Sequence, residues 1–236
     1  MHSSAVIPFK IDYPRHLEPV RDQVIDLLEH ERPERHKLVR CRYKSRCHSV
    51  YCPLCRNQDA HTKKDKLVRG VYRLGGRLLK FGTFITRDVP LEDLKETGKQ
   101  IMQSVRDVFR STNTTDYAAG LETSLPDWSD LYHPHAHALL AARQGGRGFI
   151  SEDGWLDAWL TALAADLHPL EGASRVEPVR DPEKVCTYLT KSPYRPPFNH
   201  VDIERTVEAI RAGKGLRQFS YQGEFTDNAA QCAKAA

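Results

Sequence analysis

Three histidines at alternate positions constrain the fold of this 236-residue chain more than any other feature. The segment "LYHPHAHALL", residues 131–140, places His133, His135 and His137 two residues apart. In a β-strand, residues i, i+2 and i+4 project from one face, so the three imidazoles would lie together. Ala136, Ala138 and Leu140 would face the other way into packing. The segment therefore predicts a strand that carries a metal-binding or catalytic cluster on one side.

The segments around this strand alternate between strand and helix patterns. Strands are predicted at 78–90, 114–125, 131–142, 173–180 and 216–225, and helices at 15–31, 56–74, 91–111, 151–168, 181–193 and 200–213. Pro33 is expected to end the first helix, while Asp181 and Ser151 are expected to cap later ones. Because the turn at 125–130 is short, neighbouring strands can pair as a hairpin. We therefore expect an α+β fold, an antiparallel β-sheet with packed helices.

Four cysteines lie close together near the N-terminus, in the pattern C-x5-C-x4-C-x2-C. They are Cys41, Cys47, Cys52 and Cys55. In an intracellular protein such clusters are more often metal sites than disulfides. Four thiolates complete a closed tetrahedral Zn²⁺ site, so we predict a small zinc-binding element here, with His48 as a spare ligand.

Basic residues are concentrated around these cysteines. The net charge is only +4, yet twelve Lys or Arg residues lie between Arg32 and Arg69. Such a block is typical of a surface that binds nucleic acid, although a merely solvated face is the alternative. The candidates for DNA contacts are Arg40, Arg42, Lys44 and Arg46.

The sequence also predicts where this protein resides. No apolar run approaches the ~18 residues of a membrane span, and the N-terminus lacks the apolar stretch of a signal peptide. We expect a soluble, cytoplasmic protein without a membrane partner.

A carboxylate is predicted to complete the histidine cluster. If the strand before the turn pairs with the histidine strand, Glu122 lies beside His135 and His137. Two imidazoles and one carboxylate, with coordination positions left open, suit Mn²⁺ or Mg²⁺ in phosphate chemistry, with Zn²⁺ as the alternative.

A tyrosine between two lysines is the candidate nucleophile. On the helix predicted at 182–192, Lys184, Tyr188 and Lys191 share one face. A phenol is a weak nucleophile until a nearby cation or base favours the phenolate, which a lysine and a metal together would do. Tyr194, in the proline-rich segment that follows, is the rival.

These segments together resemble the replication initiators of small rolling-circle plasmids, which belong to the HUH endonuclease superfamily. The resemblance rests on "CPLC", "FGTFIT", "HPHAHALL", "YLTK" and "LRQFSYQGEF", and covers about residues 41–223. It implies a ferredoxin- or RRM-like palm with a small N-terminal zinc-binding element. The implied domains are an N-terminal helix with the basic zinc-binding region at 1–75, the HUH endonuclease domain at 76–225, and a C-terminal tail at 226–236.

The resemblance also implies a metal-dependent enzyme that nicks and joins DNA. His135, His137 and Glu122 would bind the catalytic Mn²⁺ or Mg²⁺. Tyr188 would attack a phosphodiester, with Lys191 assisting, and leave a free 3′-OH and a 5′-phosphotyrosine.

Some family members carry a second tyrosine one turn before the first. Lys184 occupies that position here, so the chain resembles the one-tyrosine type. The implied partners are single-stranded origin DNA, hairpin or duplex origin DNA and a host helicase, and a homo-oligomer is compatible with the same reasoning.

Two other functions compete with this interpretation. "HPHAHALL" also fits the histidine-triad pattern of nucleotidyl hydrolases and transferases, in which His135 would be the nucleophile and no divalent metal is needed. A zinc-containing, non-catalytic DNA-binding repressor would bind DNA without forming a covalent product. The histidine-triad reading leaves the cysteine cluster, the basic block and the tyrosine helix without a role.

Overall fold

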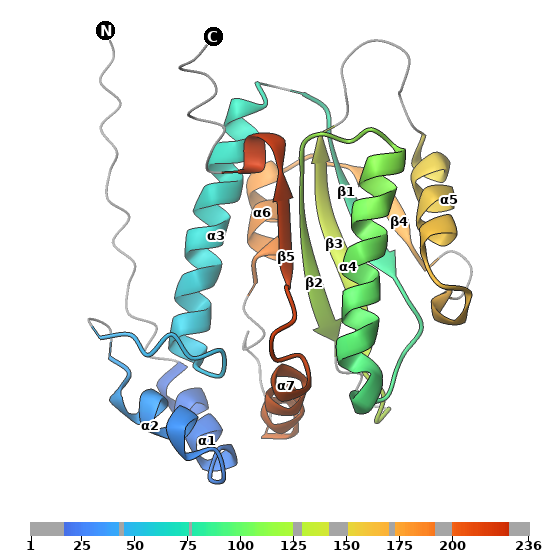
Figure 1. Cartoon of the computed structure of the whole chain (residues 1–236). Helices are drawn as coiled ribbons and strands as arrows, with labels where there is room; N and C mark the ends of the chain where they lie inside the picture. Colours follow the sequence, from blue (N-terminus) through green and yellow to red (C-terminus); the bar gives the residue numbers. More distant parts are fainter. Residues whose placement is uncertain are drawn as a thin grey trace, which may run out of the picture.

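The computed structural model describes residues 17–42, 45–75, 77–124, 129–141, 151–169, 173–191 and 200–226. At its centre lies a five-stranded antiparallel sheet in the order β4-β1-β3-β2-β5 (Figure 1). The strands are β1 Leu79–Ile85, β2 Tyr117–Ser124, β3 His133–Ala141, β4 Arg175–Pro178 and β5 Phe219–Gln222. The predicted α+β class is therefore confirmed.

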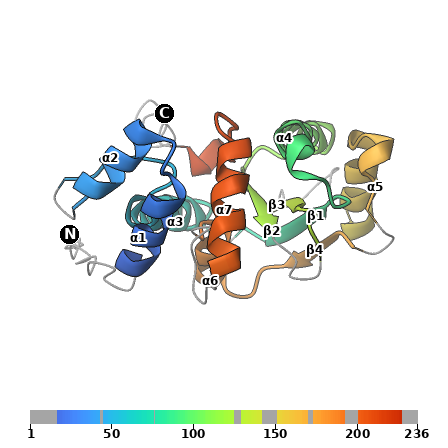
Figure 2. The same ribbon diagram turned by 90° about the horizontal axis from the view of Figure 1, so that it is seen from below.

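Helices cover both faces of this sheet. The helices are α1 Glu18–Leu27, α2 Arg32–Arg40, α3 Pro53–Arg73, α4 Leu94–Ser111, α5 Glu152–Ala162, α6 Pro182–Leu189 and α7 His200–Ala212, with short 3₁₀ turns η2 Leu91–Asp93, η3 Ala165–Leu167 and η4 Gly223–Phe225. Figure 2 shows α4 and α6 on opposite sides of the sheet, with α1 and α2 beyond α3.

The first four strands have the topology of a ferredoxin-like palm. Along the chain, β1, α4, β2, β3, α5 and β4 follow one another, and β3 lies between β1 and β2 in the sheet. This is the split β-α-β arrangement, in which a helix connects two strands that flank a third. The fifth strand, β5, extends the sheet beyond β2.

Alternation along β3 separates the core from the site. Ala136, Ala138 and Leu140 are fully or almost fully buried in the cluster beneath α4 and α5. Phe84 of β1 lies in the same cluster, with its ring centroid 5.2 Å from that of Trp159. The histidines occupy the other face, as the alternating pattern predicts.

The N-terminal segment differs from its prediction in one respect. The expected helix at 15–31 ends earlier, at Leu27, and a second helix, α2, begins at Arg32. Pro33 therefore opens a helix, and its prediction as a helix end was wrong. Proline suits the first helical turn, because the N–H that it lacks would have no partner there.

The predicted N-caps are present at two later helices. The Ser151 hydroxyl accepts a hydrogen bond of 3.1 Å from the Gly154 N–H, and the Asp181 carboxylate accepts one of 2.9 Å from the Lys184 N–H. Both satisfy N–H groups that have no partner within the helix.

Among the helices that the structure describes, none is long and apolar enough to cross a membrane.

A second apolar cluster connects the N-terminal helices to the end of the chain. Leu28 and Leu38, from either side of the first loop, pack with Tyr51 and with Ile203 and Val207 of α7. The predicted domain boundary near residue 75 stays a prediction, and α7 contributes to the N-terminal cluster from well beyond it.

The buried ring of Phe84 yields a stability prediction. Phe84→Ala should lower the free energy of unfolding by about 3–5 kcal/mol, because it leaves a cavity between Phe109 and Trp159. Tyr72→Ala is the control, because that ring is 78% exposed, and should change the value by no more than about 0.5 kcal/mol. Urea unfolding followed by circular dichroism measures both, and equal effects would contradict the core assignment.

Candidate active site and metal centres

The β2–β3 pairing brings a carboxylate and two imidazoles together. Glu122 lies directly opposite His135 in the register, and Gly120 lies opposite His137. Glu122 Oε2 is 3.2 Å from His137 Nε2 and 3.7 Å from His135 Nε2. The three ligand atoms lie within 4.8 Å of one another, so this group could hold a metal ion.

Outer contacts orient both histidines toward this centre. His135 Nδ1 lies 3.1 Å from the His133 carbonyl oxygen, which can only accept, so the proton is on Nδ1 and the Nε2 lone pair is free. His137 Nδ1 lies 3.3 Å from Thr83 Oγ1. His137 Nε2 is buried and, beyond its 3.2 Å approach to Glu122 Oε2, has no partner among the described residues. A buried nitrogen of this kind fits a metal ligand.

Electrostatics favour the metal-ligand forms of Glu122 and His135 near neutral pH. Burial would raise the pKa of Glu122, but the hydrogen bonds from His137 and Lys191 outweigh it and lower the pKa to about 2. Burial and the neighbouring charge of His137 lower the pKa of His135 to about 4. A carboxylate and a neutral imidazole are the forms that bind metal.

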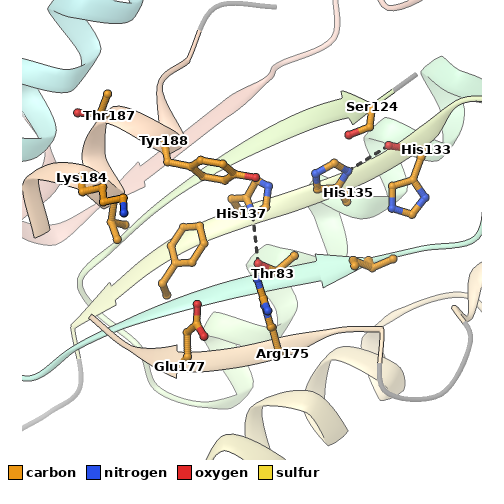
Figure 3. Close-up of a pocket in the computed structure, with 13 residues that line it drawn as sticks. Thr83, Ser124, His133, His135, His137, Arg175, Glu177, Lys184, Thr187 and Tyr188 are labelled. Carbon is orange, nitrogen blue, oxygen red and sulfur yellow. Dashed lines mark hydrogen bonds between the residues drawn. The ribbon is translucent and has the colours of Figure 1, made fainter. Parts of the chain in front are cut away.

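Tyr188 extends from α6 over this centre. Cys186 and Leu189 are buried and pack the apolar side of α6 against the protein. Tyr188 lies on the other side of the helix and is 38% exposed. The Tyr188 ring centroid lies 4.9 Å from that of His137, and the two rings meet edge to face. Figure 3 shows the hydroxyl end of Tyr188 pointing toward His137.

Lys191 connects the tyrosine to the carboxylate. Its ammonium group forms an ion pair with Glu122 Oε1 and lies 4.2 Å from the centroid of the Tyr188 ring. Lys184, from the preceding turn of α6, lines the same pocket on the other side of Tyr188. The structure thus brings together the tyrosine, both lysines and the metal-ligand group.

An open cavity of about 590 Å³ lies between α6 and the sheet. Several of its lining residues were not predicted from the sequence, among them Thr83, Ser124, Arg175 and Glu177 (Figure 3). Thr83 pairs with His137 on one side and with Arg175 of β4 on the other. Alternation in "FGTFIT" would have placed Thr83 on the same face as His137, but no local sequence pattern predicts that β1 pairs with β4.

His133 stands apart from the metal-ligand group. Its Nδ1 lies 2.5 Å from Asp88 Oδ1, and its ring borders the cavity. Of the three alternating histidines, only His135 and His137 therefore face Glu122.

The four cysteines form the second group that could hold a metal ion. The sulfur of Cys41 lies 3.6 Å from those of Cys55 and Cys52, and Cys47 lies 3.7 Å from Cys55. Four sulfurs at ~2.3 Å from a tetrahedral metal are about 3.8 Å apart, so the spacing fits. Hydrogen bonds with neighbouring sulfurs and burial raise the pKa of the Cys52 thiol, and a bound cation would reverse this. His48 is exposed and lies outside the group.

Three of the four predicted DNA-contacting residues are described, and each is close in sequence to a cysteine of the four-sulfur group. Arg40, at the end of α2, is exposed, and Arg46 is half-buried. The Arg42 guanidinium donates to the carbonyl oxygens of Val39 and Cys41. Lys44 and the rival tyrosine, Tyr194, lie outside the described residues.

Comparison with known proteins places the chain among replication proteins. A profile of the family "Replication protein" matches residues 38–234. "Protein rep" of Streptococcus pneumoniae serotype 2 (strain D39 / NCTC 7466) is 25% identical over 197 residues, which cover 77% of this chain and 61% of that protein. "Protein rep" of a Bacillus species is 27% identical over 140 residues, covering 56% and 46% respectively. The chain thus spans about half the length of the curated relatives it matches. No solved structure matches significantly.

The Glu122, His135 and His137 group and the cysteine group should bind metal ions independently of each other. His137→Ala should weaken Mn²⁺ binding, with Mn²⁺ as the probe ion, by more than about 10-fold, because even outer-shell partners contribute about 10- to 100-fold. Metal held by the cysteine group should be unchanged. Isothermal titration measures the affinity for Mn²⁺, and elemental analysis measures the metal held by the cysteine group. His133→Ala is the matched control, and equal loss of Mn²⁺ binding in both variants would contradict the Glu122, His135 and His137 group.

Proposed function

The chain belongs to the replication-protein family, and from this premise we propose that it initiates rolling-circle replication of a plasmid by nicking and joining single-stranded DNA. The observation that carries the proposal is the position of Tyr188. Its exposed phenol lies beside a largely buried Glu/His/His group, in which His137 Nε2 has no partner other than Glu122 among the described residues. A nucleophile next to a metal-ligand group with open positions is suited to phosphoryl transfer.

The two ligand sets favour different ions. The oxygen and nitrogen donors of Glu122, His135 and His137 suit Mn²⁺ or Mg²⁺, whereas the four thiolates suit a structural Zn²⁺. When bound, the divalent ion at the first site would neutralise the non-bridging oxygens of the scissile phosphate.

Tyr188 attacks the scissile phosphorus in this proposal. The bond from Tyr188 Oη to phosphorus forms while the bond from phosphorus to the 3′ oxygen breaks. The phenol proton passes to solvent, which reaches the partly exposed side chain, and the leaving 3′ oxygen takes a proton from water. The products are a 5′-phosphotyrosine and a free 3′-OH, so the phosphodiester can be resealed.

Lys191 and Glu122 act together around this nucleophile. The Lys191 ammonium, held by Glu122, lies near the Tyr188 ring and stabilises negative charge that develops on the phenolate. Glu122 thus serves both as a metal ligand and as the group that orients Lys191.

Two cations on opposite walls of the cavity suit a strand that crosses the sheet. Arg175 extends from β4 and Lys184 from α6. Both can contact backbone phosphates on either side of the scissile position. The strand must be single because the phosphate has to enter the cavity between α6 and the sheet.

Helix α6 has no second tyrosine one turn before Tyr188, so one subunit alone would not carry out both strand-transfer steps. Lys184 occupies the position one turn before Tyr188, so release of the second strand end requires another subunit or water. We therefore include a homo-oligomer and a host helicase among the proposed partners. We retain 1–75 as the duplex-holding region, with Arg40, Arg42, Lys44 and Arg46 on phosphates, 76–225 as the nicking domain and 226–236 as its tail.

The histidine-triad alternative places the covalent bond on His135. That side chain is only 6% exposed and its Nε2 faces Glu122, whereas Tyr188 is open to the cavity. The non-catalytic repressor alternative forms no covalent bond with DNA at all. The identity of the linked residue therefore separates the three functions.

Tyr188→Phe should abolish covalent linkage to DNA while leaving folding and metal content unchanged, since only one oxygen is removed. The wild-type chain, incubated with Mn²⁺ and a labelled single-stranded oligonucleotide from the plasmid origin, should give an adduct that survives SDS. Tyr72→Phe, on the exposed side of α3, is the matched control and should retain the adduct. If Tyr188→Phe still forms one, peptide mapping would locate the nucleophile, with Tyr194 and His135 next in line.

Loss of two basic residues beside the cysteine group should weaken duplex binding at every sequence. For Arg40→Ala combined with Arg42→Ala, the slope of log K against log salt should decrease in magnitude by about 1–2, since each phosphate contact contributes about 0.9. Fluorescence anisotropy with duplex DNA at several salt concentrations measures this slope. An unchanged slope would mean that this surface is only solvated.

A further inference from the structure

Helix α2 presents an exposed face that the nicking site does not use. Successive residues of an α-helix rotate by about 100°, so residues spaced i, i+3, i+4, i+7 and i+8 share one stripe. Five exposed side chains of α2 follow this spacing: Arg32, Arg35, His36, Val39 and Arg40. The sequence did not predict this helix.

The opposite side of α2 is fixed to the protein. Leu38 is fully buried in the N-terminal apolar cluster, and Glu34 accepts a hydrogen bond of 2.7 Å from the Ser49 hydroxyl. Cys41 follows the last residue of the helix and belongs to the four-sulfur group. The helix is therefore held from behind and at its C-terminal end, with the stripe facing outward.

The arginines of this stripe have no ion-pair partner among the described residues. Within the part of the chain that the structure describes, Arg32, Arg35 and Arg40 form no ion pair, whereas Lys37 pairs with Glu34 at 3.0 Å. Lys37 lies beside the stripe, not on it. Three guanidinium groups on one short helix, unpaired within the described segments, complement a strongly anionic partner.

Val39 distinguishes this face from a merely solvated one. It is 47% exposed and lies in the C-terminal turn of the stripe, three residues after His36 and next to Arg40. An apolar side chain adds nothing to phosphate contacts. It can contact base edges in the major groove, where thymine presents a methyl group and guanine presents hydrogen-bond acceptors.

We propose that α2 reads duplex DNA in the major groove. Arg35, His36 and Val39 face the base edges, and Arg32 and Arg40 contact phosphates at either end. The groove is about 12 Å wide and admits an α-helix, and a helix of nine residues is about 14 Å long, which suffices for a few base pairs. The inference rests on the proposed replication function and adds to it a sequence-specific duplex partner, separate from the single strand at Tyr188.

The first test uses selection from a pool of short duplexes with a randomised centre. The full, metal-loaded wild-type chain should enrich one sequence motif. Arg35→Ala should reduce the preference at a single base pair by about 5- to 100-fold and leave the other positions of the motif unchanged. Arg40→Ala should weaken all sequences alike. Lys37→Ala, which removes the same charge beside the stripe, is the matched control and should enrich the wild-type motif.

A charge-preserving variant separates base reading from electrostatics. Arg35→Lys keeps the charge but loses the planar fork that bonds guanine with two parallel hydrogen bonds. It should lose discrimination at the same base pair while the salt dependence of binding stays at the wild-type value. Val39→Ala should reduce preference at a neighbouring thymine, and it serves as the second reading variant if Arg35→Ala lowers the melting temperature.

Two outcomes would overturn the inference. Either the wild-type chain enriches no motif, or the reading variants enrich it with unchanged preference at every position. Covalent adduct formation on a single-stranded oligonucleotide is measured with the same proteins and reports on the proposed nicking function alone. An intact adduct with an unchanged motif rejects the role of α2 only, whereas a missing wild-type adduct with an altered motif rejects nicking only.

Discussion

The pairing register of β2 and β3 is the constraint on which the proposed site depends. Glu122 lies opposite His135 and shares a face of the sheet with His137. Because side chains alternate with a period of two, a slip of one residue would turn Glu122 toward α4 and α5. Tyr117 and Ala119 are buried on that side, so their packing fixes the register. The apolar core on one face thereby positions the carboxylate on the other.

The proposed nucleophile, Tyr188, reaches the candidate metal-ligand group from a distant part of the chain through α6. This helix begins with an Asp181 cap and is pressed against the sheet by Cys186 and Leu189. The same packing that buries these two side chains leaves Tyr188 outward and over His137. The ion pair between Glu122 and Lys191, which lies two residues after the end of α6, then joins this segment to β2. Positioning by a rigid sheet and a packed helix is what in-line attack on phosphorus requires.

The cysteine group would position the helices of the N-terminal region. Cys41 directly follows α2, Cys52 directly precedes α3 and Cys55 lies in the first turn of α3, so one metal ion would hold the two helices together. The apolar cluster that includes Leu38 extends to Ile203 and Val207 of α7. A small element with few apolar residues of its own is thus supported both by its four-sulfur group and by the rest of the protein.

Local patterns in the sequence determined a large part of this protein. Alternating histidines predicted a strand with His133, His135 and His137 on one face. Cysteine spacing predicted one group that could hold a metal ion, and Asp181 predicted where α6 begins. These features depend on backbone geometry within a few residues, which the sequence specifies directly. Only the tertiary structure decided that Arg175 borders the cavity and that His133 turns to Asp88, because strand pairing and packing set those contacts between distant residues. It also decided that Pro33 opens a helix, because proline is compatible with either a helix end or a helix start, and the burial of Leu38 against α7 favours the second.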